Sequence, residues 1–296
     1  MNTIDHRYDF VFLFDCQDGN PNGDPDSNNS PRYDPETFQG LVSDVCLKRK
    51  IRDYVRYSRS DASKYPGYGI FILSGTTLES RQRLPFERIS GEENLDPKGK
   101  STKSSDVDVA RKWMCRNFFD IRAFGAVMST TRFNCGQVRG PVQITFARSV
   151  DRVMLMEHTI YRQAFTGEKD IKGGSGTLAR KFTIPYGLYV AHGYINPVFA
   201  ASTGFNDEDL ALLWEALGNL FELDRSAARG TMAARGLYIF QHQSKLGNAR
   251  AQRLFESIKI CKNKDGESPR SFADYTVSVP DPGSLPPGIQ LIDGLS

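Results

Sequence analysis

The chain has 296 residues, 39% hydrophobic and 25% charged, a composition that permits a packed core and excludes wholesale disorder. The net charge of +3 does not by itself indicate a nucleic-acid ligand, and five widely spaced cysteines without a Cys-x-x-Cys pair disfavour a disulfide scaffold or a zinc site. No apolar run approaches the roughly 18 residues of a membrane span and no secretory signal is visible, so we expect a cytoplasmic protein with no membrane partner.

The first predicted element is a strand over residues 8–16. Aromatic residues at alternate positions face one way and Val11 and Leu13 face the other, so the strand is expected to be buried on both faces. A turn-rich stretch from Asp18 to Asp34 follows. We then expect a helix from Thr37 to Tyr57, a strand from Tyr68 to Leu73 and a polar surface insertion over residues 74–108.

The second half of the chain also alternates predicted strands with predicted helices. A capping residue, Asn206, precedes apolar residues at helical spacing, which predicts an amphipathic helix. The tail from Val279, with four prolines, is expected to be a loosely held extension. The other expected elements are a helix over 109–119, a strand over 141–147, a glycine-tipped excursion over 167–181 with a returning arm over 183–192, and a strand over 237–240.

This order of elements predicts an α+β fold, with helices packed on one side of an antiparallel sheet. A split β-α-β (ferredoxin-like) core is the simplest layered arrangement that fits, and two excursions project from it.

The strongest local signal lies on the first helix. Five cations fall within an arc of roughly 100°, beside an apolar arc that would pack inward. Such a row matches the phosphates of a single strand, although a solvated helix face is the alternative. The five are Lys48, Arg49, Arg52, Arg56 and Arg59.

Further polar and basic segments add to this signal. The loop 18–34 could wrap a phosphate backbone with Asn20, Asn22 and Arg32. A calcium site there is disfavoured because Asn29 stands where a bidentate glutamate is required. No metal or cofactor is expected. The other basic residues are Arg180 and Lys181 in the excursion and Arg225, Arg229 and Arg235 in a segment without acids.

Leu178 is an apolar residue beside the glycine tip that contains Gly174 and Gly176. On an exposed basic excursion it could wedge between bases, and packing against Phe182 is the alternative.

Four segments together resemble a known family: residues 9–25 (DFVFLFDCQDGNPNGDP), Leu47–Asp53, Asp120–Gly125 and Gly140–Gln143. The chain is similar, from about Tyr8 to Lys262, to the backbone subunit of type I-C Cascade, a CRISPR surveillance complex. That subunit is a member of the repeat-associated mysterious protein superfamily.

The resemblance implies a modified RNA-recognition-motif fold shaped as a hand. The palm would comprise residues 1–60, 109–158 and 185–278, with fingers at 61–108, a thumb at 159–184 and a tail at 279–296. It implies a protein that is not an enzyme, that polymerises with copies of itself along the spacer of the CRISPR RNA and that leaves the bases free to pair with target DNA. Other type I-C Cascade subunits would be its further partners.

By the resemblance, Lys48, Arg49 and Arg52 line the RNA and Gly174, Gly176 and Leu178 form the thumb tip. It also places Asn20, Asn22 and Arg32 in the matching loop after the first strand, and Arg225, Arg229 and Arg235 in another RNA-facing loop. Backbone subunits of related type III complexes cut RNA with a loop aspartate and a divalent metal, so a ribonuclease using Asp24, Asp26 or Asp34 is the alternative function. A generic single-strand-binding protein is a third.

Overall fold

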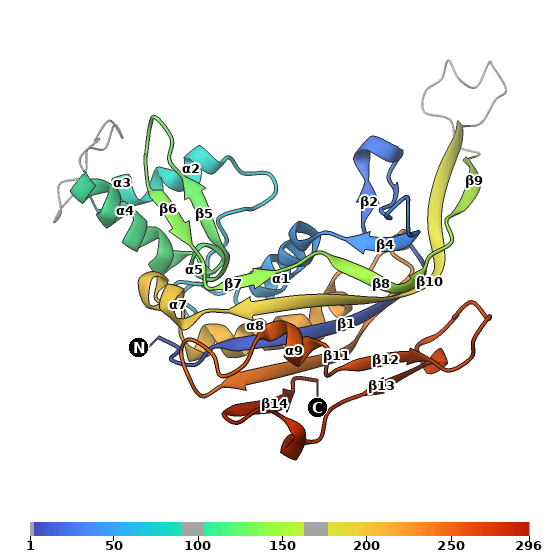
Figure 1. Ribbon diagram of the computed structural model, residues 1–296. Coiled ribbons are helices and arrows are strands. Elements are labelled where there is room, and N and C mark those ends of the chain that lie inside the picture. Colours follow the sequence, from blue (N-terminus) through green and yellow to red (C-terminus); the bar gives the residue numbers. More distant parts are fainter. Residues whose placement is uncertain (1–2, 90–103, 163–176, 296) are drawn as a thin grey trace, which may run out of the picture.

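The computed structural model describes residues 3–89, 104–162 and 177–295. They form a mixed α+β fold around an antiparallel sheet (Figure 1), as the order of elements predicted. The strands of the main sheet are β1 (Tyr8–Gly19), β4 (Gln39–Val42), β7 (Val142–Ile144), β8 (Ala147–Arg152), β9 (Met156–Arg162), β10 (Thr177–Ile195), β11 (Thr231–His242) and β14 (Ile289–Asp293).

The sheet runs in the order β14-β11-β1-β10-β8-β4, and β7 and β9 also pair with β10. Strand β1 lies at its centre, where Phe12 pairs with Ala191 of β10 and with Leu237 of β11. The expectation that β1 is buried on both faces is confirmed: Phe10, Phe12 and Phe14 belong to one core cluster, whereas Val11 and Leu13 belong to another.

Two long helices cover one face of this sheet. Helix α1 (Asp44–Ser58) follows β4, and α8 (Asp207–Leu223) lies between β10 and β11 in the chain. Asn206 is confirmed as the N-cap of α8, within a capping box completed by Asp209. The other face is covered by the segment after β11, which contains α9 (Ala251–Phe255), β12 (Lys259–Lys262) and β13 (Tyr275–Ser278).

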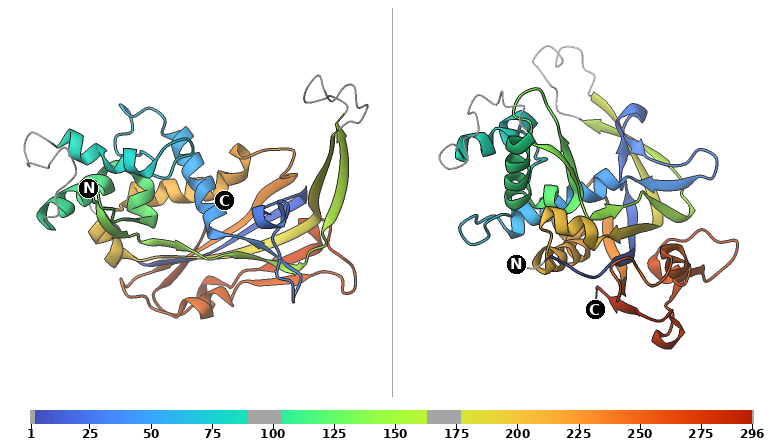
Figure 2. Two further views of the ribbon diagram at one scale, coloured as in Figure 1. Left: turned by 90° about the horizontal axis from the view of Figure 1, so that it is seen from above. Right: turned by 60° about the vertical axis from the view of Figure 1, so that its left-hand side comes forward.

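Two projections rise from the sheet, and α1 lies between them (Figures 1 and 2). One is built from the chain between α1 and β7 and has a core cluster of its own, which includes Phe71, Phe86, Met114 and Phe133. The other is the paired arm of β9 and β10, beside a smaller hairpin of β2 (Gly23–Asp24) and β3 (Ser30–Pro31). The first projection contains α2 (Leu78–Gln82), α3 (Leu84–Arg88), α4 (Ser104–Asn117), α5 (Phe119–Phe124), β5 (Gly125–Met128) and β6 (Gly136–Arg139).

The structure corrects three expected elements. The helix expected from Thr37 begins at Asp44, because residues 39–42 pair with β8 as strand β4. The stretch 68–73 is not a strand, since Gly69 makes only an isolated bridge to Phe118. The tail from Val279 is not a loose extension, because β14 pairs with β11 at the edge of the sheet.

The remaining elements are short. A helix α7 (Pro197–Thr203) follows β10, and 3-10 turns lie at Pro25–Ser27, Phe272–Asp274 and Pro282–Ser284. Among the described residues, no helix combines the length and the apolar character that crossing a bilayer requires.

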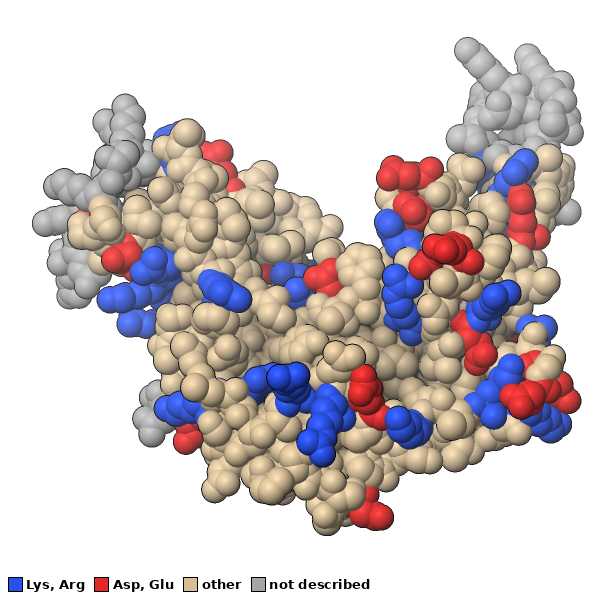
Figure 3. Space-filling model, in the orientation of Figure 1, with Lys and Arg blue, Asp and Glu red and all other residues tan. Residues whose placement is uncertain are grey.

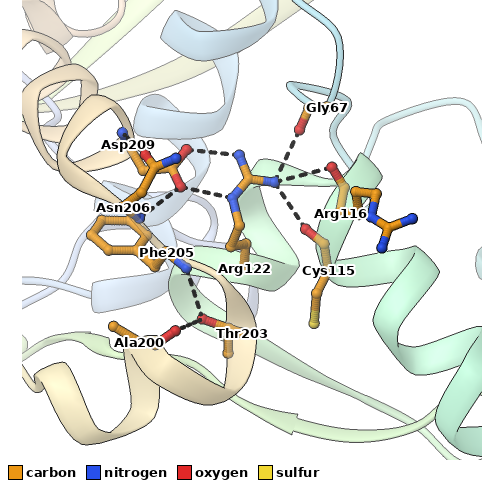
Figure 4. A network of polar contacts seen from close by, with 9 residues as sticks. All are labelled: Gly67, Cys115, Arg116, Arg122, Ala200, Thr203, Phe205, Asn206 and Asp209. Atoms are coloured by element: carbon orange, nitrogen blue, oxygen red, sulfur yellow. Dashed lines mark hydrogen bonds and ion pairs between the residues drawn. The ribbon is translucent and has the colours of Figure 1, made fainter. Parts of the chain in front are cut away.

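Buried ion pairs tie the first projection to the two long helices. On α5, Asp120 accepts from Arg52 Nε of α1 at 2.9 Å, and Arg122 donates two bonds of 2.7 Å to Asp209 of α8 (Figure 4). The Arg122 guanidinium also donates to the carbonyl of Cys115 at 2.8 Å, so α4 is fixed through the same group. Two side chains of one short helix thus fix the projection to the sheet's helical layer.

We expect Asp209→Asn to lower the free energy of unfolding by about 3 kcal/mol, because it leaves the buried Arg122 guanidinium without a charged partner. Asp207→Asn, an exposed change in the same helical turn, is the matched control and should cost less than about 0.5 kcal/mol. Urea denaturation of both variants measures the difference. Equal losses would contradict the role given to this pair.

Candidate nucleic-acid interface

Helix α1 forms the floor of the hollow between the projections. Ser43 caps it by accepting from the Cys46 amide, and Asn22 Oδ1 in turn accepts from both the Ser43 amide and hydroxyl, each at 2.9 Å. Leu47, Ile51 and Val55 anchor the helix in the main core. Asn22 therefore stabilises the N-terminus of α1, and its side-chain oxygen already accepts hydrogen bonds from Ser43.

The expected row of five cations on α1 is wrong in part. Arg52 is buried and bonded to Asp120, so it belongs to the interior. Arg59 pairs with Glu215 of α8 at 3.2 Å. Arg52 lies only about 60° around the helix from Val55, so it turns toward the core once α5 packs there.

Three cations of the row remain toward the hollow to different degrees. Lys48 is partly covered and pairs with Asp44 at 3.0 Å, whereas the Arg49 side chain is half exposed and contacts Asp53 at 3.1 Å. Arg56 is exposed and its guanidinium lies over the ring of Tyr57. Lysine and arginine side chains, interspersed with acids, surround the hollow in the space-filling view (Figure 3).

One carboxylate joins α1 to the loop that follows α8. Asp224 contacts Lys50 Nζ in a very close ion pair, Arg229 Nε at 2.8 Å and the Arg49 guanidinium at 3.7 Å. We call these four residues the Asp224 cluster. Burial is the main cause that lowers the pKa of Lys50 to about 7, and burial also lowers the pKa of Arg229. Two arginines and a lysine thus share the Asp224 carboxylate, and Arg49 also contacts Asp53.

The loop after α8 is also where other expected segments meet. The Asn20 amide donates to Ala228 O at 2.8 Å, and Lys181 of the β10 arm donates to Ala227 O at 2.7 Å. A pocket of about 430 Å³ opens there, lined among others by Asp224, Arg225 and Arg229. The structure therefore brings α1, the loop 18–34, the arm and the loop 224–230 together.

Sequence reasoning missed Asp224 and Lys50. The basic segment that it singled out begins at Arg225, one residue after the acid on which its charge depends. Lys50 lies on the inward side of α1, outside the arc that was chosen. An isolated acid between a strong helix and an arginine-rich turn was the available signal.

Other expected site residues have partners inside the chain. Asn20 is buried and its side chain donates to Asn29 O at 2.6 Å, and Arg32 pairs with Asp24 at 3.3 Å. Arg180 pairs with Glu157 across the arm at 3.0 Å. Arg225 is exposed and pairs with Glu222.

The structure does not bring Arg235 together with the other expected RNA-facing residues. Its guanidinium bonds to Asp15 at 2.8 Å and lies over the ring of Phe272, and Asp15 also accepts from Tyr186 at 3.0 Å. These partners lie on the face of the sheet that the segment after β11 covers. Arg235 is the extra residue of a bulge opposite Leu13 and Phe14, which turns it away from α1.

Leu178 stands near the end of the arm, opposite Tyr161 of β9, and 69% of its surface is exposed. It therefore does not pack into the arm, which was the alternative to a wedge. Gly174 and Gly176 lie outside the described residues.

The loop aspartates are engaged in local contacts. Asp24 pairs with Arg32, and Asp34 accepts from Arg148 at 3.0 Å, a bond that holds the pKa of Asp34 below its usual value. Across 3–89, 104–162 and 177–295, no three His, Cys, Asp or Glu side chains gather into a group suited to a metal ion.

Comparisons with known proteins identify relatives. A family model described as CRISPR-associated protein Cas7 matches residues 6–280. A CRISPR-associated protein Cas7 of Haloferax volcanii is 26% identical over 302 residues, which cover 94% of this chain and 82% of that protein.

Solved structures with a similar fold include a chain of a CRISPR RNA-guided surveillance complex in a pre-nicking state, with a TM-score of 0.49 and 14% identity over 79% of this chain and 78% of that one. A chain of another such surveillance complex gives a TM-score of 0.41 and 16% identity over 78% and 68% of the two chains. These likenesses are distant, so the sequence match over residues 6–280 decides the family.

The Asp224 cluster predicts an asymmetry between its members. Asp224→Asn should lower the free energy of unfolding by about 2 kcal/mol, because it leaves the partly buried Arg229 and Lys50 without their paired carboxylate. Lys50→Met should cost less than about 1 kcal/mol, since the carboxylate keeps two guanidinium partners and an apolar side chain suits the buried site. Urea denaturation at neutral pH, with the exposed change Asp265→Asn as control, measures both. A larger loss for Lys50→Met would contradict this account.

Proposed function

The chain belongs to the CRISPR-associated protein Cas7 family, and we propose that it is a type I-C backbone subunit that binds CRISPR RNA without cutting it. In this proposal it polymerises along the guide spacer, holds the phosphates and presents the bases to target DNA in antiviral defence. Its partners are copies of itself and the other subunits of a Cascade complex.

The observation that carries the proposal is the convergence of four polar or basic segments on one side of the sheet. Helix α1, the loop 18–34, the arm and the loop 224–230 meet around the Asp224 cluster. A single strand laid over this surface would meet the half-exposed Arg49 and the exposed Arg56 directly. Guanidinium donors of this kind hold phosphates without reading the sequence.

The strand order supports a palm of the RNA-recognition-motif kind. Strands β11, β1, β10 and β8 are adjacent in that order, with α1 after β1 and α8 between β10 and β11. We propose that the projection between α1 and β7 is the fingers and that the arm of β9 and β10 is the thumb. Since the separate core of the first projection includes Cys135, we extend the fingers beyond residue 108.

Leu178 supports a role for the thumb in displacing bases. On the described part of the arm, Leu178 is more exposed than Met156, Ile160 and Tyr161, and an apolar side chain so exposed has the shape and polarity of a wedge. The Lys181 side chain holds the arm beside the loop 224–230 by donating to the Ala227 carbonyl, so the wedge would stand at a fixed distance from the phosphates.

The first test asks what the purified protein carries. We expect RNA of one defined length to copurify with it, because a filament on a guide protects the length that it covers. Sequencing of the bound RNA should return spacer sequences flanked by repeat-derived ends. RNA of random length and origin would instead indicate a generic single-strand-binding protein.

Replacing Lys48, Arg49 and Arg56 with glutamine should weaken RNA binding strongly and flatten its salt dependence by about two to three phosphate contacts. The control replaces Lys245, Arg250 and Arg253, which are exposed beyond β11 on the other side of the sheet and have the same composition. Binding isotherms at several salt concentrations give the slopes. Equal slopes for the two triple variants would overturn the assignment of α1.

Leu178→Ala should leave most of the RNA affinity intact and restore stacking of the displaced bases. Chemical probing of base reactivity along bound RNA detects this change, since unstacked bases react faster. Val127→Ala, at another exposed apolar side chain, serves as the control. If the bases are continuously stacked on the wild-type protein, the wedge does not exist.

A further inference from the structure

An exposed aromatic pair lies at the edge of the main sheet, apart from the Asp224 cluster. The rings of Tyr33 and Phe38 are stacked with centroids 6.2 Å apart and planes 9° from parallel, and the two side chains are 37% and 48% exposed. They flank the turn that leads into β4. We call them the edge aromatic pair.

The backbone at Phe38 is strained. Its φ is +59°, a left-handed conformation that bulky side chains rarely adopt. The turn is held by the Phe38 amide, which donates to Asp34 O at 2.8 Å, and by Phe38 O, which accepts from the Val153 amide at 2.9 Å. A glycine would relieve the strain, and the ring contributes little to the core. Strain that displays an aromatic ring to solvent is typical of a binding function.

Three arginines lie in or beside the segments that carry the edge aromatic pair, together with Asp34 and Glu36 of the turn between the two rings. Arg32 precedes Tyr33 and its buried Nε has no hydrogen-bond partner, and Arg148 reaches Asp34 with more than half of its side chain exposed. Arg152 is exposed on β8, directly opposite Gln39, the residue after Phe38. A flat apolar face with exposed arginines in the neighbouring strand suits an unpaired base and its phosphates better than it suits the apolar centre of a protein interface.

We propose that the edge aromatic pair is a stacking site for a base of single-stranded nucleic acid. An unpaired base would lie on the exposed face of Phe38, continue the stack begun by Tyr33, and place its phosphates near Arg152 and Arg148. This inference rests on the proposed binding of RNA. That proposal involves contacts to phosphates, and the edge aromatic pair would add a stacking contact to a base.

The test uses the full chain and a short single-stranded RNA that carries a fluorescent purine analogue, whose emission is quenched on stacking. Phe38→Leu should abolish most of the quenching and weaken binding about ten-fold, whereas Phe38→Trp should retain both. Phe146→Leu is the matched control, because Phe146 is exposed to a similar extent at the far end of β8. Phe38→Gly should melt no earlier than the wild type and still lose the quenching, which separates binding from folding.

The outcomes also separate this inference from the proposed function. If the Lys48, Arg49 and Arg56 variant loses affinity while Phe38→Leu keeps full quenching and affinity, the stacking site is refuted and the RNA-binding role stands. If Phe38→Leu binds RNA normally but no longer assembles with copies of itself in sedimentation, the pair faces protein and the inference is wrong. If the wild type binds no RNA, both fail.

Discussion

The Asp224 carboxylate is the contact on which the proposed interface depends. It lies directly after α8 and pairs with Lys50 from the inner side of α1, with Arg49 from the outer side and with Arg229 from its own loop. An ion pair of this kind contributes little free energy in water. A shared, partly buried carboxylate contributes more, because it holds three basic side chains close together that would otherwise repel one another. The loop that it anchors then supplies carbonyl groups to the Asn20 amide and to Lys181. Without Asp224, four segments from distant parts of the sequence would have no common point of attachment.

A second set of contacts explains why a motif of the family resemblance lies inside the molecule. The segment Asp120–Gly125 includes α5, and Asp120 and Arg122 bond to α1 and α8. The residues of this motif therefore connect α5 to α1 and α8 inside the molecule and do not form a surface for RNA. The same holds for Asn22, whose oxygen fixes the start of α1. A buried ion pair restricts the side chains that its two positions accept, as a contact to a ligand would.

Periodicity predicted the parts of the fold that depend on neighbours in sequence. The strand β1, the helix α8 with its Asn206 cap, and the arm of β9 and β10 all follow from local patterns. Periodicity failed to predict elements whose structure depends on residues far away in the sequence. Residues 39–42 form the strand β4 because they pair with β8, and β14 is ordered because it pairs with β11 at the edge of the sheet. The site shows the same division. Charge on α1 was visible in the sequence, but the burial of Arg52 was not, because its partner Asp120 is 68 residues away.

The central position of β1 has a consequence for how the chain folds during synthesis. Both of its neighbours, β10 and β11, emerge from the ribosome more than 150 residues after it. Until then, a strand with a phenylalanine at every second position from 10 to 14 has no sheet to join. Non-local pairing of this kind slows folding. It also leaves an unpaired hydrophobic strand that can associate with other nascent chains. The interval before β10 and β11 are synthesised is therefore the period in which this chain is most exposed to aggregation.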